Sequence, residues 1–124
     1  MMPEKTELGC VLVCVTIQKE CGKLIEAGKK AALEAALPLK VLHVSAGGNL
    51  LGNPDAAEAM NYLFSLAREA EAEMNILYEN DAPAAIVRYA QKECARTLIL
   101  GENRSGFATH LRQLLPESTR IITP

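Results

Sequence analysis

The sequence alternates between short runs rich in aliphatic and β-branched residues and longer stretches with helical periodicity. This alternation predicts strands at 10–16, 39–45, 75–78, 97–100 and 118–123. It predicts helices at 19–37, at 54–72, after Asp81 and at 107–115. Strands that alternate with helices are joined by right-handed crossovers, so they form a parallel sheet with helices on both faces. We therefore expect an α/β fold built on an open five-stranded parallel sheet.

Several of these predicted elements carry specific signals at their ends. The run 10–16 (CVLVCVT) is almost entirely apolar, as expected for a strand that is buried on both faces. Pro54 follows Asn53 at the start of the second helix, where an Asn cap and a Pro at the first helical position are both favoured. Asp81 is expected to cap the third helix. The glycines of 46–52 predict a loop there.

Composition limits the class of protein and its partners. A length of 124 residues fits one domain, 1–124, with 1–8 as a flexible N-terminal segment. The net charge is −2 and the basic residues are scattered, which argues against a nucleic-acid partner. No apolar stretch approaches the ~18 residues that cross a bilayer, and residues 1–8 lack the pattern of a signal peptide. We therefore expect no membrane insertion, a cytoplasmic location and reduced cysteines.

In an open parallel sheet, ligands bind beyond the carboxyl ends of the strands. The turn 101–106 carries the most chemistry there, because two glycines bracket polar residues directly before a helix and their amides can face an anion. The alternative is that these glycines only allow a tight turn. The candidate ligand-binding residues are Thr16, Ile17, Gln18, Val44, Ser45, Gly101, Asn103, Arg104, Ser105 and Gly106.

The sequence gives little support for a catalytic site or a metal site. The spacing of Gly101 and Gly106 is similar to the start of a P-loop, but Phe107-Ala108 stands where that loop needs Lys followed by Ser or Thr. His43 lies inside a predicted strand and is expected to be a core residue. His110 has no second ligand at metal-binding spacing. We assign no catalytic residue and no metal site.

The cysteines are better explained by packing than by reactivity. Cys10 and Cys14 lie four residues apart on a predicted strand, so both are expected on one face as small hydrophobic residues. Cys21 lies near the start of the first helix, where a thiol pKa can fall, and redox sensing is the alternative there.

At this point the sequence resembles a known family. The series of five strands, the apolar first strand and the Leu100-Gly101-x-x-Arg104-Ser105-Gly106 turn are similar to the universal stress protein superfamily. Val13-Cys14-Val15 and the later run 23–28 (KLIEAG) are more similar to the stress-protein-like subdomain of potassium-sensor histidine kinases. The resemblance implies strand order 3-2-1-4-5 and homodimers. It also implies ATP or AMP at the ends of the first and fourth strands, with magnesium only as part of the nucleotide.

The chain departs from the pattern of the nucleotide-binding members. Arg104 occupies the position of their second glycine, and Leu114-Leu115 stands where they have Gly-Ser or Gly-Thr. The run 16–18 (TIQ) lacks the acidic residue that they often place after the first strand. The phosphate motif is thus weakened, which argues against tight ATP binding.

Three classes of function are compatible with the sequence, and the first two are favoured over the third. The first is a regulatory or sensing module that binds an adenine nucleotide. The alternative is a ligand-free dimeric interaction domain, and a slow nucleotidase ranks third because no base or metal can be named. In either leading case the last strand is an edge, and Ile121 and Ile122, on opposite faces, are expected to build the dimer. The alternative is a short edge protected by Arg120 and Pro124.

Overall fold

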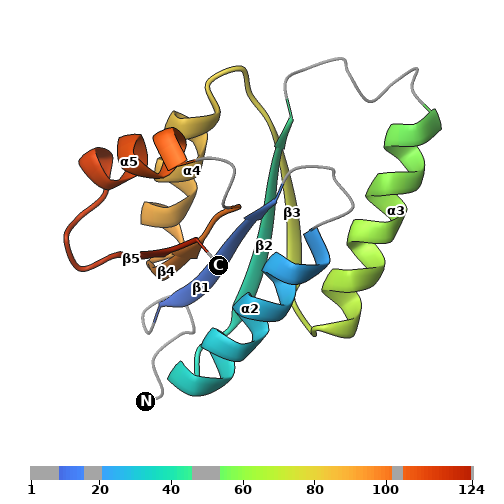
Figure 1. Ribbon diagram of the computed structural model, residues 1–124, viewed down its shortest axis with the longest axis horizontal. Coiled ribbons are helices and arrows are strands. Elements are labelled where there is room, and N and C mark those ends of the chain that lie inside the picture. The colour runs from blue at the N-terminus through green and yellow to red at the C-terminus, as the bar shows by residue number, and fades with distance from the viewer. Residues whose placement is uncertain (1–8, 16–20, 46–53, 102–104, 124) are drawn as a thin grey trace.

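The computed structural model describes residues 9–15, 21–45, 54–101 and 105–123 (Figure 1). Strands and helices alternate along the chain, as the sequence pattern predicts. The strands are β1 (Cys10–Val15), β2 (Leu39–Ser45), β3 (Glu73–Tyr78), β4 (Ala95–Ile99) and β5 (Arg120–Ile122). The helices are α2 (Cys21–Ala35), α3 (Pro54–Glu69), α4 (Ala82–Lys92) and α5 (Ser105–Leu114).

The five strands form one parallel sheet in the order β3-β2-β1-β4-β5, which confirms the predicted class and strand order. β1 lies at the centre, where it pairs with β2 from Val11↔Leu39 to Val15↔His43. Its pairing with β4 ends earlier, at Val13↔Ile99. All strands run the same way, so the sheet has an amino end and a carboxyl end.

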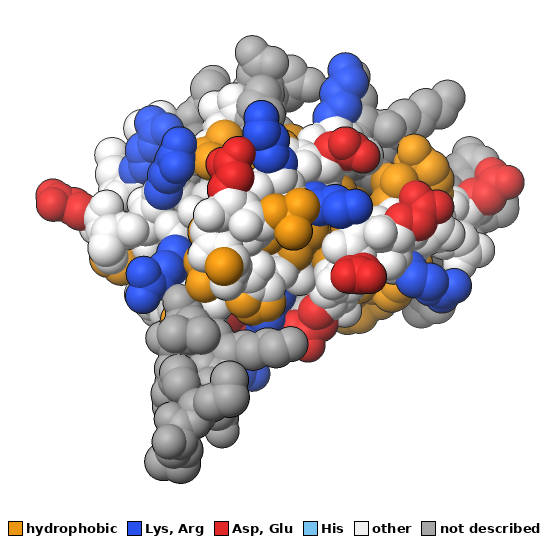
Figure 2. All heavy atoms as spheres, turned by 90° about the horizontal axis from the view of Figure 1, so that it is seen from below, with side chains coloured by type: hydrophobic (Ala, Val, Ile, Leu, Met, Phe, Trp, Pro, Cys, Tyr) orange, Lys and Arg blue, Asp and Glu red, His pale blue; other side chains and the backbone are white. Residues whose placement is uncertain are grey.

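Backbone hydrogen bonds close the turns at the amino end of the sheet. α2, α3 and α4 are each followed by a non-glycine residue in the left-handed region, namely Ala36, Glu71 and Cys94 with φ near 55–57°. The amide of the next residue bonds back into the helix, from Leu37 to Ala32 at 3.0 Å and from Ala72 to Ala67 at 2.9 Å. This is the ordinary bonding of a helix C-cap, in which glycine is the usual residue. Figure 2 views this end, where basic and acidic side chains are interspersed.

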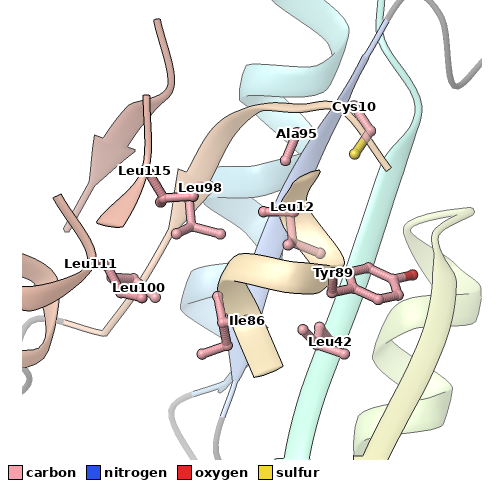
Figure 3. Close-up of a cluster of buried hydrophobic side chains, with 11 residues drawn as sticks. Cys10, Leu12, Leu42, Ile86, Tyr89, Ala95, Leu98, Leu100, Leu111 and Leu115 are labelled. Carbon is pink, nitrogen blue, oxygen red and sulfur yellow. The ribbon is translucent and has the colours of Figure 1, made fainter. Parts of the chain in front are cut away.

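The core has two halves, one on each face of the sheet. Alternate residues of β1 supply both, because successive strand side chains point to opposite faces. Val11, Val13 and Val15 join the cluster beneath α2 and α3. Cys10 and Leu12 belong to the cluster beneath α4 and α5, and Cys14 packs against it (Figure 3). The prediction that Cys10 and Cys14 share a face is thus confirmed.

Gly28 lets α2 approach the sheet closely. A Cβ at this position would lie 2.2 Å from Val13 Cγ2 and 3.0 Å from Leu39 Cδ1. Only a residue without a side chain fits that separation. The close approach fixes the height of α2 above β1, and with it the position of the first turn of the helix.

Some boundaries differ from those predicted. α5 begins at Ser105, so Ser105 and Gly106 lie in its first turn and not in a loop before it. Ser is favoured at helix starts, which explains the earlier beginning. β5 is shorter than predicted, at Arg120–Ile122. Asp81 caps α4 as expected, its Oδ1 accepting a hydrogen bond from the Ala84 amide at 3.2 Å. Among the described helices, none is long and apolar enough to cross a membrane.

Candidate functional site

The carboxyl ends of β1 and β4 form the point where the strand order reverses. From β1 the chain moves through α2 to β2 and β3 on one side of the sheet, and then to β4 and β5 on the other side. In open α/β sheets a crevice forms at such a point, outside the strand ends. This is the end of the sheet at which the sequence places its candidate ligand residues.

Gly101 follows β4 at this end, and α2 approaches it. A Cβ at Gly101 would lie 3.8 Å from Leu24 Cδ1, an ordinary van der Waals separation and the only such approach within 4 Å among the described residues. Leu24 lies in the first turn of α2. Packing by the described residues therefore does not demand a glycine at position 101, in contrast to Gly28.

The carboxyl end of β1 is held by His43. Its Nδ1 lies 2.9 Å from the carbonyl oxygen of Val15, the last residue of β1, and the side chain is 6% exposed. A carbonyl oxygen only accepts, so Nδ1 carries the proton and donates. The prediction of a core histidine is confirmed. This bond anchors the strand end that precedes Thr16, Ile17 and Gln18.

Two helices begin at the same end of the sheet. α2 starts at Cys21, after β1, and α5 starts at Ser105, after β4 (Figure 1). Helix N-termini carry unpaired amides and a partial positive charge, which suits an anion such as a phosphate. α3 also lies near the start of α2, since a Cβ at Gly22 would lie 3.7 Å from the hydroxyl oxygen of Tyr62 in α3.

The predicted ligand residues are only partly described by the structure. Thr16, Ile17, Gln18, Asn103 and Arg104 lie outside the described residues. The backbone places Ser45 at the end of β2, and Ser105 and Gly106 at the start of α5.

Val44 and Gly101 lie at the carboxyl end but on different faces of the sheet. Val44 packs toward the α4 side, whereas Gly101 is approached by Leu24 of α2. The structure therefore does not bring the side chain of Val44 to Gly101. Any ligand that touched both would meet backbone groups of at least one strand.

β5 is an edge of the sheet and carries the residues predicted to build a dimer. Ile121 packs against the α4–α5 half of the core, and Ile122 against the α2–α3 half. The expectation that they point to opposite faces is confirmed. Because both side chains take part in the core of their own chain, pairing with a second chain would rest on the backbone edge. The dimer itself stays a prediction.

One cluster of described ion pairs lies at the amino end, far from the predicted site, whereas the described ion pair between Arg88 and Glu79 follows the carboxyl end of β3. Lys40 Nζ lies 3.2 Å from Glu73 Oε2 and 3.2 Å from Glu93 Oε1, with the Lys40 and Glu93 side chains 12% and 16% exposed. Tyr89 Oη is buried nearby and has no hydrogen-bond partner in the described part of the chain. Burial raises the pKa of Tyr89, and the charges of Glu93 and Glu73 raise it further.

The sequence analysis did not find this polar cluster. Lys40 reads as a polar residue of an alternating strand, and Glu93 as part of a helix end, so only the fold brings them together. In the described ranges, no group of three or more His, Cys, Asp or Glu residues is arranged to hold a metal ion.

The chain is similar to several solved structures of known proteins. No family model and no curated protein matches the chain. A universal stress protein from Archaeoglobus fulgidus in complex with dAMP superposes with a TM-score of 0.70, at 20% identity over 93% of this chain and 96% of that one. A universal stress protein family member from Burkholderia pseudomallei gives 0.69, at 15% identity over 98% and 100%.

A third solved structure, a universal stress protein in complex with cAMP, gives a TM-score of 0.64 at 13% identity, over 93% of this chain and 96% of that one. The alignments cover nearly the whole of each chain. The chain has the universal stress protein fold. The strand order of this chain is the one that the sequence resemblance implied.

Proposed function

We propose that this chain is a regulatory module of the universal stress protein type that binds an adenine nucleotide at the carboxyl ends of β1 and β4. The observation that carries the proposal is the fold. Its sheet order reverses beside β1, and two structures that superpose on nearly the whole chain hold dAMP and cAMP. A ligand at this switch point is also what the topology favours on physical grounds.

The surroundings of Gly101 support this placement. The described residues leave space beside its backbone, and the N-termini of α2 and α5 lie at the same end of the sheet. A nucleotide phosphate would be stabilised by such helix starts. The weakened phosphate motif favours a monophosphate such as AMP over ATP, because fewer groups remain to hold a triphosphate. Signalling would follow from a ligand-induced shift in a surface read by a second copy, through β5, or by another protein.

A thermal-shift experiment tests the proposal. Purified, nucleotide-stripped protein is heated with AMP, cAMP, ADP or ATP, with and without magnesium. A ligand at one hundred times its Kd adds about 2.7 kcal/mol, which raises the midpoint by several degrees. We expect the largest shift with a monophosphate and no requirement for magnesium.

Two variants locate the site. Gly101→Val places a side chain where the described residues leave space, so it should keep the fold and abolish the shift. Ala35→Val also introduces a valine, at an exposed position at the other end of α2, and should leave the shift intact. If no nucleotide shifts the midpoint of well-folded protein, the ligand-free dimeric interaction domain becomes the better hypothesis.

A further inference from the structure

Two cysteines far apart in sequence meet at the amino end of the sheet. Cys10 opens β1, and Cys94 is the residue before β4. Cys10 is paired with Ala95 in the sheet, and its amide donates a hydrogen bond to the Cys94 carbonyl oxygen at 3.3 Å. Figure 3 shows Cys10 beside Ala95. One direct backbone hydrogen bond holds two residues at about the Cα separation that disulfides span, 4.4–6.8 Å.

The thiol of Cys10 already points to the turn that carries Cys94. Its Sγ donates to the Glu93 carbonyl oxygen at 3.5 Å. That carbonyl belongs to the peptide bond between Glu93 and Cys94. The Cys10 sulfur therefore lies next to the backbone of Cys94. Both thiols are free, Cys10 is buried and Cys94 is exposed.

Cys94 also occupies a position where a side chain is unfavourable. Its φ is 55°, and the left-handed region favours glycine at a helix C-terminus. A cysteine with an exposed side chain thus stands at a strained position, and its carbonyl oxygen accepts a hydrogen bond from the amide of a buried cysteine.

We propose that Cys10 and Cys94 are a redox pair that closes to an intrachain disulfide on exposure to a low-molecular-weight disulfide such as oxidised glutathione. The Cys94 thiolate attacks one sulfur of the glutathione disulfide, and the first glutathione leaves as a thiolate. Cys10 then loses its proton and attacks the Cys94 sulfur, which expels the second glutathione. Two electrons pass from the two protein thiols to the glutathione disulfide, and two glutathione thiols are released.

The second step should limit the rate at neutral pH. Burial raises the pKa of Cys10 to about 11; Lys40 lowers it, while Glu93, Cys94 and Glu73 raise it. The Tyr89 side chain faces the same region. Since only the thiolate attacks, the rate of closure should rise about tenfold per pH unit between pH 7 and 9.

The bond would also change stability. It joins Cys10 to Cys94 and so closes a long loop, and cross-links that close long loops restrict the unfolded state most. We expect the thermal midpoint to rise by several degrees in the oxidised protein. This inference is independent of nucleotide binding, because the pair lies at the opposite end of the sheet from the proposed site.

The experiment uses the full chain in glutathione buffers of increasing oxidised fraction at pH 8. Remaining thiols are alkylated and the protein is analysed by mass spectrometry, whole and after proteolysis. We expect the loss of two thiols without retained glutathione, a peptide pair linked through Cys10 and Cys94, and a higher thermal midpoint. Non-reducing electrophoresis should show a monomeric chain for this species.

Two variants keep the buried Cys10 intact. Cys94→Ser should fold, because the side chain is exposed, and should lose both the linked peptides and the rise in midpoint. Cys21→Ser is the matched control and should close like the parent. The proposal is overturned if Cys94 stops at a glutathione mixed disulfide at pH 9, forms only intermolecular dimers, or stays free at every buffer composition.

Discussion

At the amino end of the sheet Lys40 forms ion pairs with two acidic residues, whereas at the carboxyl end the described residues leave space beside Gly101. Lys40 joins β2 to Glu73 of β3 and to Glu93 after α4. At the other end, His43 anchors β1, and Gly101 has one described neighbour within 4 Å of where a Cβ would lie. Bonds made within the chain leave few groups for a ligand, whereas the described residues leave room for one beside Gly101.

This difference indicates that the two ends of the sheet have different roles. The Lys40 ion pairs tie β2 to β3 and to the end of α4, and they lie away from the strand ends at which parallel sheets bind ligands. Substitutions at the amino end should therefore change the free energy of unfolding. Substitutions at Gly101 should change ligand binding with little effect on stability.

Two glycines give the sharpest comparison, Gly28 within α2 and Gly101 beside the first turn of that helix. Gly28→Ala places a Cβ 2.2 Å from Val13 Cγ2, so α2 or β1 must shift. Overpacking of this kind costs about 1–3 kcal/mol or more, and the helix propensity of Ala offsets less than about 1 kcal/mol of it. We expect urea unfolding to show a loss of about 2–3 kcal/mol. Gly101→Ala should stay within about 0.5 kcal/mol of the parent. Equal losses would mean that the packing around the two glycines does not differ.

Lys40 tests the amino end through its ion pairs. Lys40→Met leaves Glu93, 16% exposed, without its partner, which should cost about 2 kcal/mol. The pair with Glu73 contributes less, because the Glu73 side chain is 58% exposed. Adding Glu93→Gln removes the stranded charge and should restore most of the loss in urea unfolding. A double variant as unstable as Lys40→Met would show that packing of the lysine chain matters more than charge.

Alkaline pH should lower the free energy of unfolding through two residues of the same amino end, Cys10 and Lys40. Burial raises the pKa of Cys10 from 9.0 to about 11, so above pH 9 the unfolded chain loses a proton that the folded chain keeps. Burial lowers the pKa of Lys40, but hydrogen bonds to Glu93 and Glu73 outweigh this and hold it above its ordinary value of 10.5. The Lys40 contribution is complete below that value and is lost as the pH rises through the folded pKa.

We therefore expect the free energy of unfolding to fall by about 1 kcal/mol per pH unit between pH 9 and 11. Cys10→Ala, measured in reducing buffer, should be less stable at pH 8 but should lose less between pH 9 and 10.5. Parallel curves for the two proteins would show that Cys10 does not contribute to the alkaline loss.

His43 offers the corresponding test at the carboxyl end. His43→Leu removes a buried donor from the Val15 carbonyl, which should cost about 1–2 kcal/mol. His43→Asn can place its amide near the position of Nδ1 and should recover part of that loss. Hydrogen exchange at the end of β1 should speed up in the Leu variant and less in the Asn variant. An unchanged exchange rate in His43→Leu would mean that His43 only fills the core.

Much of the fold could be predicted from the sequence, and less of the site. Strand and helix periods are local, so the apolar run of β1 and the Asp81 cap could be read directly. Strand order depends on which side of the existing strands each crossover adds the next strand. The prediction of that order came from the family resemblance. The pairs Lys40–Glu93 and Cys10–Cys94 lie far apart in sequence, so only the register of the sheet brings them together. The close approach of Gly28 to Val13 could not be predicted either, because it depends on how α2 packs on the sheet.

The smallest expected effect concerns the helix ends at the amino end of the sheet. Ala36 follows α2 with φ 55°, a conformation that costs a residue with a Cβ about 1 kcal/mol. Ala36→Gly removes that cost but adds entropy to the unfolded chain, so we expect a net gain of about 0.5 kcal/mol in urea unfolding. Ala35→Gly is the matched control, because Ala35 is the last residue of α2 and is likewise exposed. It should lose about 0.5–1 kcal/mol instead. A loss at both positions would mean that the left-handed turn is not strained, and that the amino end is held by its hydrogen bonds at no conformational cost.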